Sequence, residues 1–247
     1  MEFLRRCLDD PEAVPCGRCD NCAGALFDTE VSSGSLSAAG AFLGRPGAEI
    51  APKKMWPTGM AAVGISLKGK IGPAEQIEPG RAVGRLSDLG WGTRLRGVVG
   101  PESPDAPVPA ELAAAVIEVL KAWARGDDAW QQRPVGAVAV GSHRHPQLVH
   151  SLAEHIATVG RLPLLGALRP ARSGAESFRG NSAQRVRALH DAFTVPPEVA
   201  DGIDTHPGPL LLVDDLVDSG WTMTLAGRAL RRAGAASVLP LALAVAG

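Results

Sequence analysis

An apolar run that ends in two acids and continues into a short loop is the part of the sequence best suited to chemistry. From residue 210 to residue 224 it reads Leu-Leu-Leu-Val-Asp-Asp-Leu-Val-Asp-Ser-Gly-Trp-Thr-Met-Thr. Backbone N–H groups at a helix start and the hydroxyls of Ser219 and Thr222 suit a phosphate, and Gly220 allows close approach. Asp214 and Asp215 instead suit sugar hydroxyls, or Mg²⁺ held through water. The run predicts a ribose phosphate site.

The same residues also have a plain structural interpretation. The two acids would then close the loop by hydrogen bonding to its backbone, with Ser219 and Thr222 as N-caps of the following helix. Residue type and spacing leave this alternative open. In an open parallel sheet, however, ligands bind outside the carboxyl ends of the strands, which is where this loop is expected.

A second polar loop follows another apolar stretch, at residues 141–146 (Gly-Ser-His-Arg-His-Pro). Arg144 suits the bidentate binding of phosphate oxygens, and Ser142 offers a hydroxyl beside it. His143 and His145 raise the alternative of a metal site. Two histidines on a loop without neighbouring carboxylates are more often ordinary loop residues, so we do not expect a metal site here.

The cysteines are the third chemical feature. The chain has four, and Cys16, Cys19 and Cys22 fall within seven residues. Three thiolates at two-residue gaps are typical of structural Zn²⁺, which takes four ligands. Cys7 is the only remaining cysteine and is the candidate fourth ligand, although its place in an amphipathic stretch equally suits a buried apolar residue.

The elements that must position these residues alternate between strand and helix. Apolar strands are predicted at 135–140, 162–168, 210–213 and 238–245, and helices with one apolar face at 112–123, 148–159, 186–193 and 223–233. Such alternation predicts an α/β domain at 109–247, in which helices flank a parallel sheet.

The residues before this domain have a different character. Residues 51–100 contain eight Lys or Arg and three Asp or Glu, although the whole chain has a formal net charge of −1. Glycines and prolines interrupt this stretch, which favours a basic irregular connector or small module at 31–108. A partial zinc-binding helical piece is expected at 1–30. Since no apolar stretch approaches the roughly 18 residues of a membrane span, we expect a cytoplasmic protein without membrane contact.

The run at 210–224 resembles the phosphoribosyl pyrophosphate motif of type I phosphoribosyltransferases, with matches at Asp214, Asp215, Ser219, Gly220 and Thr222. The resemblance implies that the acids hold the ribose hydroxyls, that residues 218–222 hold the 5′-phosphate, and that Mg²⁺ accompanies the ligand. It also implies that Asp218 acts on a purine-like base as general acid or base. The loop carrying Ser142 and Arg144 would bind pyrophosphate, and residues 171–185 would form the hood. Trp221 departs from the family pattern and would stack on a base or narrow the pocket.

The opening residues resemble the zinc-binding subdomain of RecQ-type DNA helicases, and the order of segments resembles the carboxyl-terminal half of the actinobacterial members. Aligned on the cysteine cluster, that family's first ligand falls just before Met1, so we expect a longer protein with a helicase motor upstream. Residues 1–247 contain no G-x-x-x-x-G-K-[ST] loop, and therefore no motor of their own.

The resemblances imply an accessory region of a DNA repair or recombination helicase. It would contact DNA through the zinc-binding piece (the zinc piece, residues 1–30) and the basic segment (residues 51–100). The alternatives are an active purine-type phosphoribosyltransferase and a non-catalytic ligand-sensing domain.

Overall fold

A computed structural model describes residues 1–24, 30–126, 129–170 and 180–247. The chain divides into two compact units, Met1–Leu43 and Gly44–Gly247. This division differs from the boundaries predicted at residues 30 and 108. The reason is that residues 44–108 contribute two strands to the same sheet as the carboxyl-terminal part and pack against its helices.

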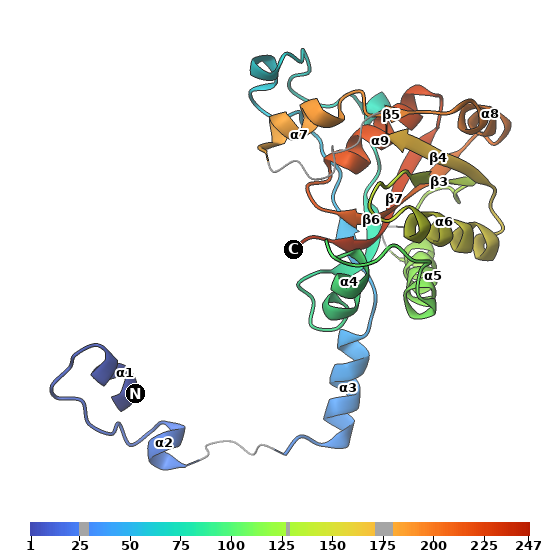
Figure 1. The fold of residues 1–247 in the computed structure, drawn as a ribbon. Coiled ribbons are helices and arrows are strands. Elements are labelled where there is room, and N and C mark those ends of the chain that lie inside the picture. Colours follow the sequence, from blue (N-terminus) through green and yellow to red (C-terminus); the bar gives the residue numbers. More distant parts are fainter. Residues whose placement is uncertain (25–29, 127–128, 171–179) are drawn as a thin grey trace. The chain divides into compact units, whose positions relative to one another are not determined.

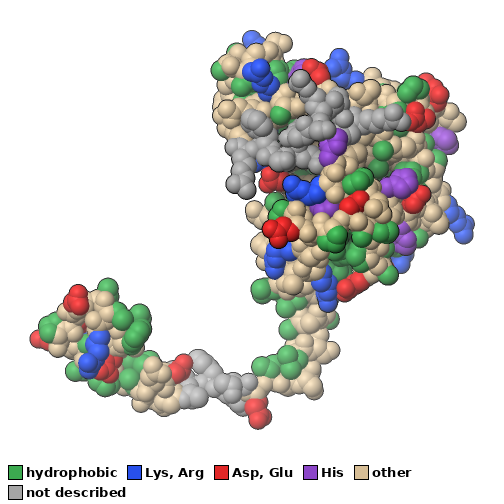
Figure 2. Space-filling view, in the orientation of Figure 1, with side chains coloured by type: hydrophobic (Ala, Val, Ile, Leu, Met, Phe, Trp, Pro, Cys, Tyr) green, Lys and Arg blue, Asp and Glu red, His purple; other side chains and the backbone are tan. Residues whose placement is uncertain are grey.

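The smaller unit consists of three short helices: α1 (Glu2–Cys7), α2 (Asp20–Ala23) and α3 (Ser33–Leu43). None of these helices carries a buried residue. Phe3 is 72% exposed, and Figure 2 shows hydrophobic side chains on the surface of this unit. A piece this small cannot bury enough apolar surface to be stable by itself, and metal binding is a common source of stability in such pieces.

The larger unit is built on one seven-stranded sheet in the order β1-β2-β7-β6-β3-β4-β5 (Figure 1). The five central strands are parallel, and β1 and β5 pair antiparallel at the two edges. The strands are β1 (Ala48–Ile50), β2 (Gly80–Arg85), β3 (Gly136–Val140), β4 (Leu164–Pro170), β5 (Phe193–Thr194), β6 (Pro209–Val217) and β7 (Ser237–Val245). The prediction of an α/β architecture is therefore confirmed, and the sheet is mixed but mostly parallel.

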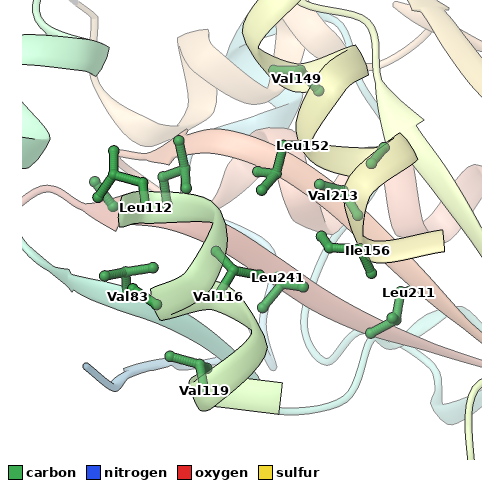
Figure 3. Packing of buried hydrophobic residues seen from close by; sticks show 14 of the residues in the cluster. Val83, Leu112, Val116, Val119, Val149, Leu152, Ile156, Leu211, Val213 and Leu241 are labelled. Carbon is green, nitrogen blue, oxygen red and sulfur yellow. The ribbon is translucent and has the colours of Figure 1, made fainter. Parts of the chain in front are cut away.

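Helices cover both faces of this sheet. They are α4 (Gly92–Val99), α5 (Ala110–Arg125), α6 (Pro146–Gly160), α7 (Ser182–Leu189), α8 (Pro197–Thr205) and α9 (Trp221–Arg232), with 3₁₀ turns η1 (Met60–Val63) and η2 (Pro73–Glu75). On one face α5 and α6 pack on β6 and β7, as Val116, Ile156 and Leu241 illustrate in Figure 3. On the other face α8 packs on β4, and α9 packs against the alternate side chains of β6 and β7.

A third apolar cluster joins the basic segment to α7 and α9. Trp56, Met60 and Ile71 pack there with Val186 of α7 and Leu225 of α9. Helix α7 lies beside η1, as Figure 1 also shows. The segment predicted to be a connector is therefore part of the larger unit and lies over the start of α9.

Several sequence predictions need correction. β1, β2, α4 and α8 were not predicted, because their apolar residues are few and glycine or proline interrupts the pattern. The helix predicted at 186–193 ends at Leu189, and Phe193 belongs to β5. None of the helices within the described residues has both the length and the apolar character required to cross a membrane.

Candidate functional site

A pocket lies where the carboxyl ends of β3 and β6 meet the start of α9. It brings together the whole set of residues predicted from the two polar loops: Ser142, Arg144, Asp214, Asp215, Asp218, Ser219, Gly220 and Thr222. Arg185 and Leu189 of α7 also line it. Parts of the chain more than 70 residues apart thus surround one space, as the switch-point rule for parallel sheets predicts.

The two acids lie inside β6, not after it as predicted. Pairing of β6 with β3 stops at Val213, whereas pairing with β7 continues to Val217. The acids therefore occupy the part of β6 that extends beyond its neighbour β3, next to the pocket. Both residues are largely buried, with exposures of 4% for Asp214 and 9% for Asp215.

Each acid also makes local hydrogen bonds. Asp214 Oδ1 accepts the N–H of Asp215 at 2.9 Å, and Asp215 Oδ1 accepts the N–H of Leu216 at 2.8 Å. Asp215 Oδ2 lies 2.7 Å from Nδ1 of His145. The structural interpretation of the acids is therefore partly correct, because both order the backbone of β6. A carboxylate oxygen has two lone pairs, so these bonds leave capacity to accept from a ligand.

The hydroxyls of the loop do not cap the helix. The N-cap of α9 is Gly220, which has a φ of 77° and no side chain with which to cap the helix. The alternative in which Ser219 and Thr222 are N-caps is therefore wrong. Ser219, Gly220 and Thr222 line the pocket at the start of α9, where a helix start and hydroxyl groups favour an anion.

Helix α6 starts near the same pocket but is capped. The carboxylate of Asp105 accepts the N–H groups of Gln147 at 3.0 Å and of Leu148 at 3.1 Å. This satisfies the positive end of α6 from within the chain.

The tryptophan that departs from the family pattern has a structural role. Trp221 is 4% exposed and stacks on Trp56, with ring centroids 6.1 Å apart and planes at 12°. It does not line the pocket, so the expectation that it stacks on a base is wrong. Its packing partner comes from the basic segment, which explains why residues around Trp56 lie so close to the loop.

Lys53 lies near the loop for the same reason. Its ammonium is 5.7 Å from the centroid of the Trp221 ring, a cation–π geometry. Its Cε would lie 3.3 Å from a Cβ placed on Gly220. One of the lysines expected to contact DNA therefore lies beside the proposed phosphate loop.

The candidate general acid or base, Asp218, forms an ion pair. Its Oδ2 lies 2.5 Å from Nη1 of Arg185 on α7, and 63% of the Asp218 side chain is exposed. An exposed carboxylate that lines a pocket can contact a ligand there. In this structure, however, the Asp218 carboxylate is already paired with the guanidinium of Arg185. Residues 171–179 of the hood predicted at 171–185 lie outside the described residues. Its last residues enter α7 (Ser182–Leu189), which begins with a capping box formed by Asn181 and Gln184.

Cys16, Cys19 and Cys22 form a candidate metal centre in the smaller unit, their sulfurs all within 4.8 Å of one another. The Sγ atoms of Cys19 and Cys22 are 3.5 Å apart. Tetrahedral Zn²⁺ with bonds of about 2.3 Å requires sulfurs roughly 3.8 Å apart, so the cluster fits this ion. Cys7 is exposed and is not among the gathered sulfurs, so its predicted ligand role does not correspond to this arrangement.

The thiols of the cluster influence one another's acidity. Hydrogen bonds from Cys16 and Cys22 to the sulfur of Cys19 lower its pKa to about 7. For Cys22, a hydrogen bond from the backbone of Gly17 favours the thiolate, but the contact with Cys19 and desolvation outweigh it and raise the pKa. Cys19 is therefore the thiol most ready to ligate a metal near neutral pH.

Comparison of the chain with protein-family models, with curated proteins and with solved structures found no match. The functional assignment therefore rests on the residues themselves. Sequence reasoning missed the places of Lys53, Asp105 and His145 near the pocket, whereas Arg185 is the last residue of the predicted hood. Of the three missed residues, only His145 had a local signal, because it stands in the polar loop after β3.

Proposed function

We propose that the larger unit is a type I phosphoribosyltransferase-like domain that binds phosphoribosyl pyrophosphate, or a closely related ribose phosphate, together with Mg²⁺. The observation that carries this proposal is that two separate polar loops and two buried acids line one pocket at the start of α9. A phosphate, a polyol and a divalent cation are the partners that these groups suit.

In this proposal each group has a distinct task. The N–H groups at the start of α9, with Ser219 and Thr222, bind the 5′-phosphate, and Asp214 and Asp215 accept hydrogen bonds from the ribose hydroxyls. Ser142 and Arg144 bind the pyrophosphate. Mg²⁺ would neutralise phosphate charge, held through water by the acids.

Calorimetry with phosphoribosyl pyrophosphate and Mg²⁺ tests the proposal directly. We expect binding by the full chain and at least a tenfold loss in Asp214→Asn, since the lost charge weakens hydrogen bonds to hydroxyls. Asp191→Asn is the matched control, because this carboxylate is 92% exposed and does not line the pocket. Absence of heat at millimolar ligand would contradict the proposal.

Catalysis is a separate question from binding. If the domain is a purine-type transferase, release of pyrophosphate in the presence of a purine base should follow binding, and Asp218→Asn should lower the rate more than the affinity. Binding without pyrophosphate release from any purine base would favour the ligand-sensing alternative.

The cysteine cluster favours a second candidate function, that of an accessory region of a RecQ-type DNA helicase. In this view the zinc piece and the basic segment contact DNA. Lys54, Lys68 and Lys70 belong to the basic segment, and both Lys68 and Lys70 stand in a turn-rich stretch. Figure 2 shows acidic and basic side chains intermixed on the visible face of the larger unit.

Salt dependence of DNA binding tests this second candidate. Basic residues bind DNA by releasing counterions, so the zinc-loaded full chain should bind at about 50 mM salt and lose affinity steeply above it. Replacement of Lys54, Lys68 and Lys70 by alanine should flatten the slope. Undetectable binding to both single- and double-stranded DNA at low salt would contradict the DNA contact.

A further inference from the structure

His145 is a buried polar residue between the two loops of the pocket. Its side chain is 1% exposed, and it immediately precedes α6. Its backbone N–H donates to Ser142 Oγ at 3.0 Å, which closes the loop after β3. Its Nδ1 lies 2.7 Å from Asp215 Oδ2. One residue therefore connects the proposed pyrophosphate loop with a proposed ribose-binding acid.

The hydrogen bonds of the pair determine where the ring proton lies. An ionised carboxylate only accepts hydrogen bonds, so Nδ1 of His145 must be the donor to Asp215. The other ring nitrogen, Nε2, is buried and has no hydrogen-bond partner among the described residues. A proton on Nε2 would be a buried, unsatisfied donor, whereas a lone pair there is less costly. The neutral ring with its proton on Nδ1 fits this environment best.

A purely structural role explains this residue poorly. An apolar ring would fill the same space without an unsatisfied nitrogen, and Asp215 already has a backbone donor in Leu216. Unlike an apolar ring, histidine supplies an N–H group that can donate a hydrogen bond to Asp215 Oδ2. The resulting bond fixes the carboxylate against rotation and leaves its remaining lone pairs in a defined direction.

We propose that His145 is a positioning residue that donates from Nδ1 to Asp215 and thereby orients this acid toward the ribose hydroxyls of the ligand. This inference rests on the proposed function, since the ligand is the same ribose phosphate. It adds that the loop after β3 controls the geometry of the acids on β6.

Three variants test the role by their affinity for phosphoribosyl pyrophosphate with Mg²⁺. His145→Phe keeps a ring but removes the donor, and we expect at least a tenfold loss, as for a hydrogen bond to a charged group. In His145→Asn the side-chain amide takes the place of Nδ1–H, so affinity should stay within about threefold of the native value. His150→Asn changes an exposed histidine on the same helix and should have no effect.

The ring proton provides a readout that needs neither ligand nor folded variant. Nitrogen NMR of the native chain should show His145 protonated on Nδ1 and not on Nε2. A proton on Nε2 alone, or native affinity in a folded His145→Phe variant, would overturn the inference. If the native chain binds no ribose phosphate, the proposed function fails, and the NMR result then decides the His145–Asp215 bond separately.

Discussion

Arg185 on α7 and Asp218 in the loop before α9 form an ion pair, with Nη1 of the arginine 2.5 Å from Oδ2 of the aspartate. Both residues line the pocket. The pair joins the helix that packs on the basic segment to the loop proposed to hold a phosphate. A bound phosphate would compete with Asp218 for the guanidinium, so we expect Arg185 to contribute to ligand binding as well as to the packing of α7.

Arg185→Ala should weaken the binding of phosphoribosyl pyrophosphate by about tenfold, since a hydrogen bond to a charged group is lost. Its effect on stability should be small, because 63% of its partner's side chain is exposed and such pairs contribute about 0–1 kcal/mol. Calorimetry and thermal unfolding separate the two effects. Arg187→Ala, which changes an arginine of the same helix that does not line the pocket, is the control. Equal affinity in both variants would show that Arg185 does not contact the ligand.

Lys53→Ala should lower affinity for the same ligand, by about tenfold, because the lysine lies beside Gly220 at the start of α9 and a charged hydrogen bond is lost. A phosphate there would receive both the ammonium and the helix dipole. Lys54→Ala is the control, since it changes the neighbouring lysine. Neither lysine is a lining residue of the pocket, but the Lys53 side chain lies over the Trp221 ring and beside Gly220. A loss confined to DNA affinity in Lys53→Ala would instead assign this residue to the DNA-binding candidate.

The carboxyl-terminal strands and helices were predictable because their apolar periodicity is strong. The run from Leu210 is nearly all apolar, as buried parallel strands are, and it is flanked by a polar loop. Its predicted end is too early, because two adjacent aspartates are typical of a loop. Pairing with β7 carries the strand to Val217, and this pairing partner cannot be known from local sequence.

The residues that surround the site from elsewhere in the chain were not predictable. Asp105 caps α6 from the end of the segment predicted to be a connector, and Trp56 stacks on Trp221 across more than 150 residues. Such contacts depend on tertiary packing and leave no periodic signal. The pocket's own residues were predictable because loops after parallel strands converge at one edge of a sheet.

Gly227→Ala should destabilise the larger unit, although alanine favours a helix by about 1 kcal/mol. A Cβ at this position in α9 would collide with Cγ2 of the buried, β-branched Ile77, and such overpacking costs about 1–3 kcal/mol. Gly97→Ala is the control, because a Cβ added to this glycine of α4 would meet no atom within 4 Å. Thermal unfolding should show a lower midpoint for the first variant and an equal or higher one for the second. The reverse order would contradict the close packing of the basic segment on α9.

Metal content should depend on the cysteine cluster and not on Cys7. Zinc analysis of the full chain purified without chelator should give about one ion per chain, lost in Cys19→Ser because one of three gathered thiolates is removed. Cys7→Ser should keep its zinc, since this thiol lies outside the cluster. Loss of zinc in Cys7→Ser would show that Cys7 is a zinc ligand after all.

Alkylation of the metal-free chain should distinguish the thiols. Because its pKa is lowered to about 7, Cys19 is about half thiolate at pH 7, whereas the raised pKa of Cys22 keeps that thiol protonated. Iodoacetamide at pH 7 should therefore modify Cys19 first, as mass spectrometry of peptides would show. Below about pH 6 the preference should fade, since Cys19 then takes up its proton as well. Zinc should protect Cys19, because a ligated thiolate cannot react with the reagent, and equal rates with and without the metal would contradict its role as a ligand.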